Sequence, residues 1–282
     1  MLAGESMGVK MKVLGVGDAA KKAADFIKST GYEIECSAVQ PISESGEDII
    51  GSSQLDEALM ILLVISGLEN DEVSKLVVDI GGANHREDLL TIFIHVELDF
   101  EADEKKLVQA RLDTVIPSMT ATFIIKNEQL QCFKRERVPY THDSLVNEVY
   151  FQTIVAITSP AINIGYIGVD FNDIVELYSP GGSSQKGTVC LFGFGRAEGE
   201  GRAVSAMNQA INMLGIDLSN LSESAGVQVV MLADEDSFSM DEYADHMDIL
   251  YDNLDENIDL FSALNLFEEQ REDLCSYLVV RY

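Results

Sequence analysis

The chain has 282 residues, of which 46% are hydrophobic and 24% charged, so it is globular and long enough to bury one large core or two medium ones. Its 48 Asp and Glu residues outnumber 19 Lys and Arg, giving a formal net charge of -29. Nucleic acids and anionic membrane surfaces repel such a chain, which argues against both as partners.

The first half of the sequence alternates apolar runs with helix-forming segments. Asp18 stands where it can cap the first helix, and Gly31 stops that helix. The predicted order is strand 12–17, helix 18–29, strand 34–39, strand 59–66, helix 71–80, strand 91–96, helix 101–114 and strand 121–126, with a polar loop at 41–53. This alternation predicts a parallel sheet with helices on both faces.

A long apolar helix at 143–158 follows, and Pro160 is expected to end it. Beyond it we predict helix 170–178, loop 179–187, strand 188–194, helix 201–214, strand 227–233, helix 239–254 and closing strands near 258–264 and 274–280. The sequence therefore predicts an α/β protein of two domains joined by the long helix.

The four cysteines and four histidines form no pattern with metal-ligand spacing. Each cysteine lies in or beside an apolar run, which indicates buried free thiols in a reducing compartment. Residues 1–12 lack the apolar core of a signal peptide, and the longest apolar runs are too short to cross a bilayer. We expect a cytoplasmic protein with no metal.

Acidic residues concentrate near the C-terminus, where residues 234–273 hold 15 acids and one base. A solvated surface that keeps the protein soluble is the simplest interpretation. A docking surface for a basic partner and adaptation to high salt are alternatives.

Two short motifs allow both a structural and a functional interpretation. Gly15 and Gly17 stand at the end of the first predicted strand, but no third glycine completes a dinucleotide motif and Asp18 opposes a phosphate, which favours a tight turn. Asp170 and Asp173 stand three apart at a helix start, where helix capping alone accounts for them.

The segment from Gly165 to Asp173 resembles the synergy loop of FtsZ, the bacterial tubulin relative, which reads close to G-L-x-N-V-D-F-A-D-V. Matching positions are Gly165, Val169, Asp170, Phe171 and Asp173, while Gly168 replaces the family's Asn. The resemblance also covers the first strand, the long helix and the segments at 199–213, 215–218 and 227–233. It implies a tubulin/FtsZ-like fold with a Rossmann-like domain at 1–142, a central helix and synergy-like loop at 143–178, and a smaller α/β domain at 179–282.

The loops that bind GTP in that family are altered in this chain. The family's glycine-rich run after the first strand corresponds to Gly15, Gly17 and Asp18, and its G-G-G-T-G-T-G signature corresponds to a segment that contains Gly67, Glu69, Asp71 and Glu72. A third loop is replaced by acidic residues at 96–101. Only Asn147 and Glu148, at the family's base-contacting positions, are similar to the family's residues, which are Asn or Asp followed by Asp. Acids and bulky side chains oppose a triphosphate, so we expect the nucleotide site to be degenerate.

The resemblance thus implies a chain that has lost its nucleotide site but keeps the loop with which one FtsZ subunit contacts the next. We expect a non-catalytic protein without a cofactor that binds or caps filaments of FtsZ or another tubulin-like partner, through Gly165, Gly168, Asp170, Phe171 and Asp173. The alternatives are a divergent GTPase that binds GTP or GDP and self-associates into its own filaments, and a tubulin-like scaffold with an unrelated binding role. From the resemblance we expect a chain that lacks the family's flexible C-terminal tail after Tyr282.

Overall fold

The computed structural model describes residues 10–39, 59–84, 86, 89–97, 101–134, 140–162, 165–181, 185–221, 225–267 and 272–281. The loop predicted at 41–53 lies outside them. The chain divides into two compact units: the N-terminal unit, Val9–Ile154 with Tyr178–Val189, and the C-terminal unit, which contains Val155–Leu177 and Cys190–Tyr282. The domain boundaries inferred from the sequence, 142/143 and 178/179, stay predictions.

The N-terminal unit contains a parallel sheet of strand order β2-β1-β3-β4-β5. The strands are β1 Lys10–Val16, β2 Glu35–Val39, β3 Leu59–Ile65, β4 Leu90–Val96 and β5 Ala121–Ile125. Every residue of β4 is buried. A strand covered on both faces needs such a continuous apolar run, which is why the sequence revealed these strands clearly.

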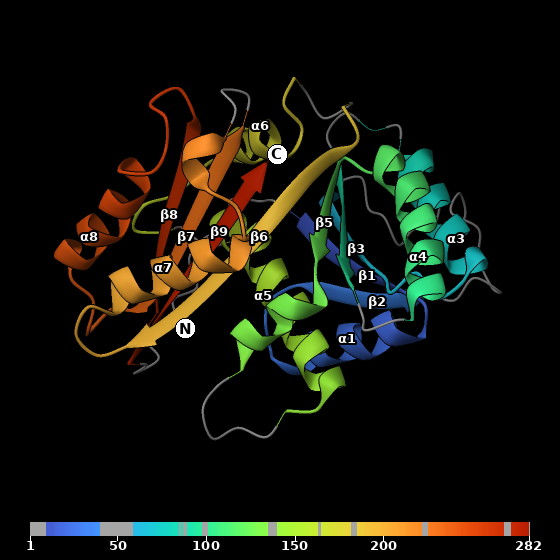
Figure 1. Ribbon diagram of the computed structural model, residues 1–282, viewed down its shortest axis with the longest axis horizontal. Helices are drawn as coiled ribbons and strands as arrows, with labels where there is room; N and C mark the ends of the chain where they lie inside the picture. Colours follow the sequence, from blue (N-terminus) through green and yellow to red (C-terminus); the bar gives the residue numbers. More distant parts are fainter. Residues whose placement is uncertain are drawn as a thin grey trace. The chain divides into compact units, whose positions relative to one another are not determined.

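Helices cover both faces of this sheet, as Figure 1 shows for α3 and α4 on one side and α1 on the other. The helices are α1 Asp18–Ser29, α3 Asp71–Ala83, α4 Ala102–Val115 and the first part of α5 His142–Ile162. Leu14 and Val16 of β1 join the core beneath α3 and α4. Gly15 between them points to the other face, where a Cβ would lie 2.7 Å from Ala20 O of α1. The glycine therefore lets α1 pack closely against β1.

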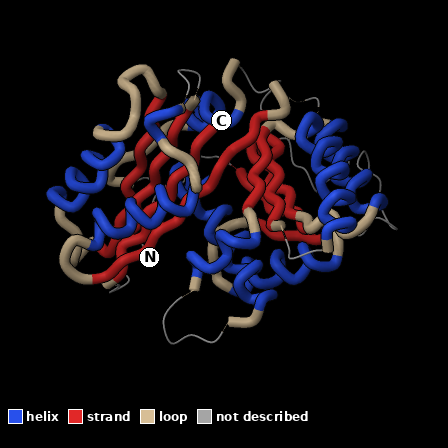
Figure 2. The backbone as a smooth tube through the Cα atoms, in the orientation of Figure 1, coloured by secondary structure: helices blue, strands red, loops and turns tan. Residues whose placement is uncertain are grey.

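The C-terminal unit contains a mixed sheet of order β6-β9-β7-β8, in which β9 is antiparallel to both neighbours. Its strands are β6 Thr188–Glu198, which begins in the N-terminal unit, β7 Gly226–Asp234, β8 Asp259–Phe267 and β9 Asp273–Arg281, and its helices are α6 Phe171–Tyr178, α7 Arg202–Leu214 and α8 Met240–Tyr251. Helices α7 and α8 cover one face, where Met207 and Leu250 pack with Val229 and Leu278. In each unit the helices flank the strands (Figure 2).

Two glycines on β6 let α7 approach the sheet. A Cβ at Gly193 would collide with the carbonyl oxygen of Ala210, and one at Gly195 with that of Ala206. Both colliding atoms belong to the helix backbone, which cannot rotate away. The close contact between β6 and α7 therefore requires glycine at both positions.

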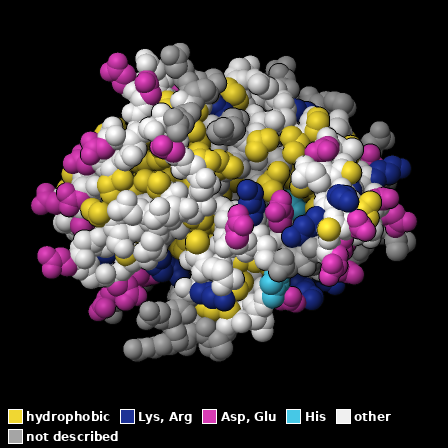
Figure 3. Space-filling view, viewed as in Figure 1, with side chains coloured by type: hydrophobic (Ala, Val, Ile, Leu, Met, Phe, Trp, Pro, Cys, Tyr) yellow, Lys and Arg dark blue, Asp and Glu magenta, His cyan; other side chains and the backbone are white. Residues whose placement is uncertain are grey.

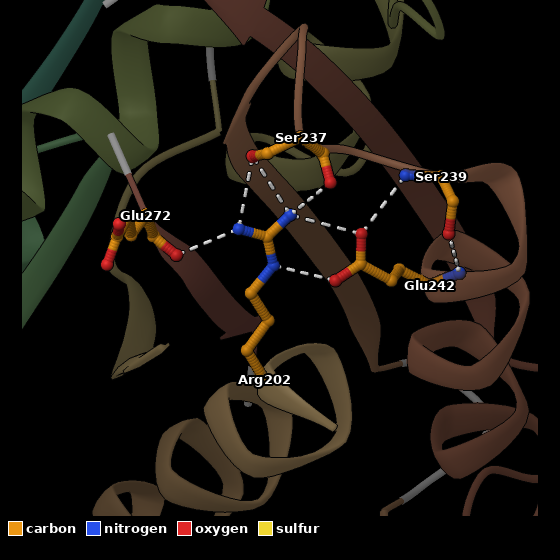
Figure 4. Close-up of polar contacts among 5 residues, drawn as sticks. All are labelled: Arg202, Ser237, Ser239, Glu242 and Glu272. Atoms are coloured by element: carbon orange, nitrogen blue, oxygen red, sulfur yellow. Dashed lines mark hydrogen bonds and ion pairs between the residues drawn. The ribbon is translucent and has the colours of Figure 1, made fainter. Parts of the chain in front are cut away.

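Arg202 ties together the start of α7, the start of α8 and the entry to β9 (Figure 4). Its guanidinium donates to both carboxylate oxygens of Glu242 at 2.7 and 3.1 Å, and to the carbonyl oxygens of Ser237 and Glu272 at 2.8 Å each. Glu242 also completes a capping box with Ser239. Burial by itself raises the pKa of Glu242, but the bonds from Arg202 and Ser239 outweigh it and lower this pKa.

The predicted helices and strands that fall on described residues are present, with ends that shift by a few residues. Helix α5 departs most: it continues to Ile162, so Pro160 lies inside it and does not end it. Proline has no N–H for the carbonyl four residues earlier, that of Ala156, and Gln228 Nε2 of β7 donates to this oxygen at 3.0 Å. Because the freed carbonyl has a partner, the helix continues past the proline. The short 3-10 helices Ile116–Ser118, Asn127–Phe133 and Leu218–Asn220 had no counterpart in the sequence analysis.

The prediction of buried thiols holds for only two of the four cysteines. All are free, and Cys190 and Cys275 are buried, but Cys36 is half-buried and Cys132 is exposed. Cys132 belongs to an irregular 3-10 segment, whose short turns follow no simple burial pattern.

Acidic side chains line the exposed side of α8, and they appear at the left of Figure 3. Asp241, Asp245, Asp248 and Asp252 recur at helical spacing and are all exposed, whereas His246 and Leu250 are buried. The acidic stretch of the sequence therefore coincides here with a solvated helix face.

Candidate functional site

The end of β1 and the βα turn after it hold three of the predicted site residues, Gly15, Gly17 and Asp18. Gly17 is the N-cap of α1 with φ 94°, a conformation that favours glycine, and no side chain bonds to the helix end from this position. Asp18 is the first helical residue, so the prediction that it caps the helix is wrong; its carboxylate is instead an acid in the first turn. Gly15 packs against α1 as described above. The turn is tight, as the sequence indicated.

The loop that follows β3 is built around a left-handed leucine. Leu68 has φ 54°, which is the only positive φ of a non-glycine residue among those described, and its side chain is buried. Ser66 Oγ accepts from Leu68 N at 3.1 Å, and Arg111 Nη1 donates to Leu68 O at 2.9 Å. Since this conformation costs about 1 kcal/mol or more without glycine, packing and these two bonds must hold the loop. Gly67, one of the predicted site residues, precedes the leucine and is buried.

The same loop closes the N-terminus of α3. Asn70 is its N-cap and accepts from Val73 N at 2.9 Å. Asp71 and Glu72 are exposed acids in the first turn, and Asp71 Oδ1 lies 2.9 Å from Arg111 Nε. A side chain therefore already caps the helix end that an anion could approach.

Glu69 joins this loop to the first βα turn. Its Oε2 lies 2.5 Å from the position that a Cβ on Gly17 would take. The carboxylate therefore occupies the space beside the α1 N-cap, the end of a helix that favours negative charge. Of the predicted nucleotide-site residues, the structure brings Gly17 and Glu69 into direct proximity.

The predicted base-contacting residues lie in the first part of α5. Glu148 accepts from Gln152 Nε2 at 2.8 Å, one helical turn along, and Asn147 is half-buried. Nearby, burial raises the pKa of Tyr150, and the charge of Glu69 raises it further. The charge of Glu69 therefore acts on one side chain of α5, that of Tyr150.

The synergy-like loop belongs to the C-terminal unit and is fixed to β8 by main-chain bonds. Leu264 O accepts from Tyr166 N at 2.7 Å, and Leu264 N donates to Ile167 O at 2.8 Å. A Cβ at Gly165 would lie 2.6 Å from the carbonyl oxygens of Ile167 and Leu264, so this position requires glycine, whereas Gly168 faces open space. The backbone of the loop is therefore set, while the position where the family has Asn is unconstrained.

The two predicted acids of this loop cap the helix that follows it. Asp173 Oδ2 accepts from Asp170 N and Asp170 Oδ1 accepts from Asp173 N, both at 2.9 Å. This reciprocal pair is a capping box for α6, whose first residue is Phe171. One oxygen of each carboxylate is engaged in it, so helix capping is a real role of both residues.

Sequence reasoning missed three residues of these regions. Arg111 of α4 donates to the loop after β3 from 43 residues along the sequence, and Leu68 keeps a glycine-like backbone without being glycine. Tyr166 is 71% exposed and stands where the resembled family has Leu. The replacement of an aliphatic residue by an aromatic one was a visible signal for Tyr166. Nothing in the sequence pointed to Arg111.

Within the described residues, no group of three or more His, Cys, Asp or Glu side chains could hold a metal ion. His95 lies in the core: its Nδ1 is 3.0 Å from Ser66 O, and burial lowers its pKa to about 4. The prediction of a core histidine is therefore confirmed. No helix in the described part of the chain is long and apolar enough to span a membrane.

No family model matches the sequence, but individual proteins do. Cell division protein FtsZ of Rickettsia conorii is 29% identical over 161 residues, which are 56% of this chain and 33% of that protein. Mitochondrial division protein fszA of Dictyostelium discoideum is 26% identical over 186 residues, 65% of this chain and 34% of that protein. The matches thus span about a third of each relative's length.

Solved structures of the same fold cover nearly the whole chain. An M. jannaschii FtsZ structure superposes with a TM-score of 0.78 at 18% identity, covering 97% of this chain and 91% of that one. The chain is an FtsZ/tubulin-like protein. CetZ2 from Haloferax volcanii, solved as a GTPγS-bound protofilament, superposes with a TM-score of 0.65 at 15% identity, covering 96% and 92%. The FtsZ/tubulin-like fold class predicted from the sequence is therefore confirmed.

Proposed function

We propose that this FtsZ/tubulin-like chain is a non-catalytic protein that does not bind GTP and that caps filaments of FtsZ or another tubulin-like partner. The observation that carries the proposal is the position of Glu69, whose carboxylate lies against Gly17 at the N-terminus of α1. A triphosphate brought to this turn meets the carboxylate of Glu69. Asp18, next to Gly17, and Glu72, three residues after Glu69, add further negative charge.

The synergy-like loop supports the binding half of the proposal. Its backbone is tied to β8, α6 is capped by Asp170 and Asp173, and Tyr166 projects into solvent. A preformed loop with an exposed aromatic side chain loses little entropy when it binds a partner. A subunit with this loop but no nucleotide site can join a filament end and offer no site to the next subunit.

Calorimetric titration with GTP, GDP and ATP tests the first half. We expect no binding at micromolar concentrations; a dissociation constant below about 10 µM, equivalent to about -7 kcal/mol, contradicts it. Light scattering of an assembling FtsZ tests the second half. Capping predicts shorter filaments at substoichiometric protein, because one molecule blocks one end.

A second candidate is a divergent GTPase that forms its own filaments. It is favoured by the CetZ2 structure, a GTPγS-bound protofilament, and by the Bacillus thuringiensis TubZ structure, solved as GDP-form protofilaments. Nucleotide-dependent sedimentation of the purified chain alone, without FtsZ, distinguishes this candidate from the first.

A further inference from the structure

Helix α1 begins without a cap of its own. Its N-cap, Gly17, has no side chain, whereas Asn70 caps α3 and Ser239 caps α8. The free N–H groups of a first helical turn carry partial positive charge and require acceptors. At α1 an acceptor must therefore come from solvent or from another part of the chain.

Glu69 places a carboxylate there from 52 residues along the sequence. Because Oε2 lies 2.5 Å from the position of a Cβ on Gly17, the carboxylate fills the space that a side chain at the N-cap takes in other helices. Because glycine at 17 has no side chain, the space is open to the carboxylate of Glu69.

The loop that presents Glu69 is held in a costly conformation. Leu68 keeps φ 54° under the bonds from Arg111 and to Ser66, and its buried side chain fixes the turn. Strain of this kind persists only where the surroundings over-determine it. The left-handed turn directs the chain so that the next side chain, Glu69, reaches Gly17.

We propose that the carboxylate of Glu69 is an internal anionic ligand of the first βα turn, which caps α1 and takes the place of an external anion. The turn then stays ordered without a bound phosphate group. The inference gives a cause for the proposed absence of GTP binding. That Glu69 caps α1 does not depend on the proposed function, whereas the idea that it replaces a nucleotide phosphate does.

Chemical rescue of Glu69→Ala tests the inference. The matched control is Glu72→Ala, which removes one exposed acid of the same unit from a helix that Asn70 already caps. Hydrogen exchange of amides 18–20 and urea unfolding are measured in sodium formate and in sodium chloride of equal ionic strength. In chloride we expect the unfolding equilibrium constant of Glu69→Ala to rise about two- to fivefold, and its amide exchange to accelerate, because a charge at a helix N-terminus has this effect.

Formate should restore both properties in Glu69→Ala and leave the parent and Glu72→Ala unchanged. Equal exchange in the parent and Glu69→Ala, or equal effects of formate on all three proteins, overturns the inference. If Glu69→Ala does not fold, Glu69→Gln, which keeps an acceptor but no charge, must show an intermediate loss that formate does not repair. Tight GTP binding by the parent refutes the proposed function and leaves the rescue result standing, so the two ideas fail separately.

Discussion

Asp170 and Asp173 can be tested as partner contacts only in variants that keep their role as caps of helix α6. Alanine at Asp170 removes the acceptor for Asp173 N, and loss of such an N-cap costs about 1 kcal/mol, roughly fivefold in the local equilibrium. A loss of filament capping by Asp170→Ala therefore mixes two causes. Asparagine keeps an oxygen acceptor at both positions and removes both charges.

We expect the double variant Asp170→Asn, Asp173→Asn to unfold in urea within about 1 kcal/mol of the parent, since the capping box survives and only its charge–dipole part is lost. The same protein should fail to shorten FtsZ filaments in a light-scattering assay, because the proposed contact depends on the two charges. If the double asparagine variant caps filaments as well as the parent, the charges are not the contact. Capping lost only in the alanine variants means that the shape of the loop is what binds.

Three further outcomes follow from the structure. Tyr166→Ala should weaken capping roughly 30-fold, as loss of an interface hot spot of about 2 kcal/mol does, whereas Tyr251→Ala, which removes another exposed tyrosine at 65% exposure on α8, should not; equal effects refute the assignment. Gly195→Ala should destabilise the fold by about 3 kcal/mol in urea unfolding, the upper end for overpacking, because the added methyl meets helix backbone; an unchanged midpoint contradicts the packing argument. Burial lowers the pKa of His95 from 6.5 to about 4. Between these pH values the unfolded state binds a proton on His95 and the folded state does not, so the free energy of unfolding should decrease as the pH falls from 6.5 towards 4. Replacement of His95 by Asn should flatten this decline, which a urea series at several pH values measures.

Most of the fold could be read from the sequence because its signals are local. The strands of the N-terminal unit are unbroken apolar runs, such as Leu90–Val96, and Gly31 marks the end of α1 within two residues. Helix ends were less certain, since a proline stops a helix only if its freed carbonyl finds no partner. The partner of Ala156 is Gln228, 72 residues away, and no local pattern reveals such a pair.

In the candidate sites, too, local features could be predicted from the sequence and long-range contacts could not. The sequence placed acids in the loop after β3, which was enough to predict that the nucleotide site is degenerate. It did not show which acid points where: Glu69 reaches Gly17, while Asp71 faces Arg111. For Asp170 and Asp173 the spacing of three residues indicated capping, and the structure has that capping box.

Pro160, inside α5, is a position where the usual replacement of a helix proline by alanine is not expected to stabilise the protein. Replacing a helix proline by alanine usually restores a main-chain bond and stabilises the protein. In this chain a new N–H at position 160 competes for Ala156 O with the Nε2 of Gln228. Gln228 is only 1% exposed, so water cannot replace Ala156 O as its hydrogen-bond acceptor. Among related sequences, positions 160 and 228 should therefore change together: a glutamine on the strand where the helix has proline, and an apolar residue on the strand where it does not.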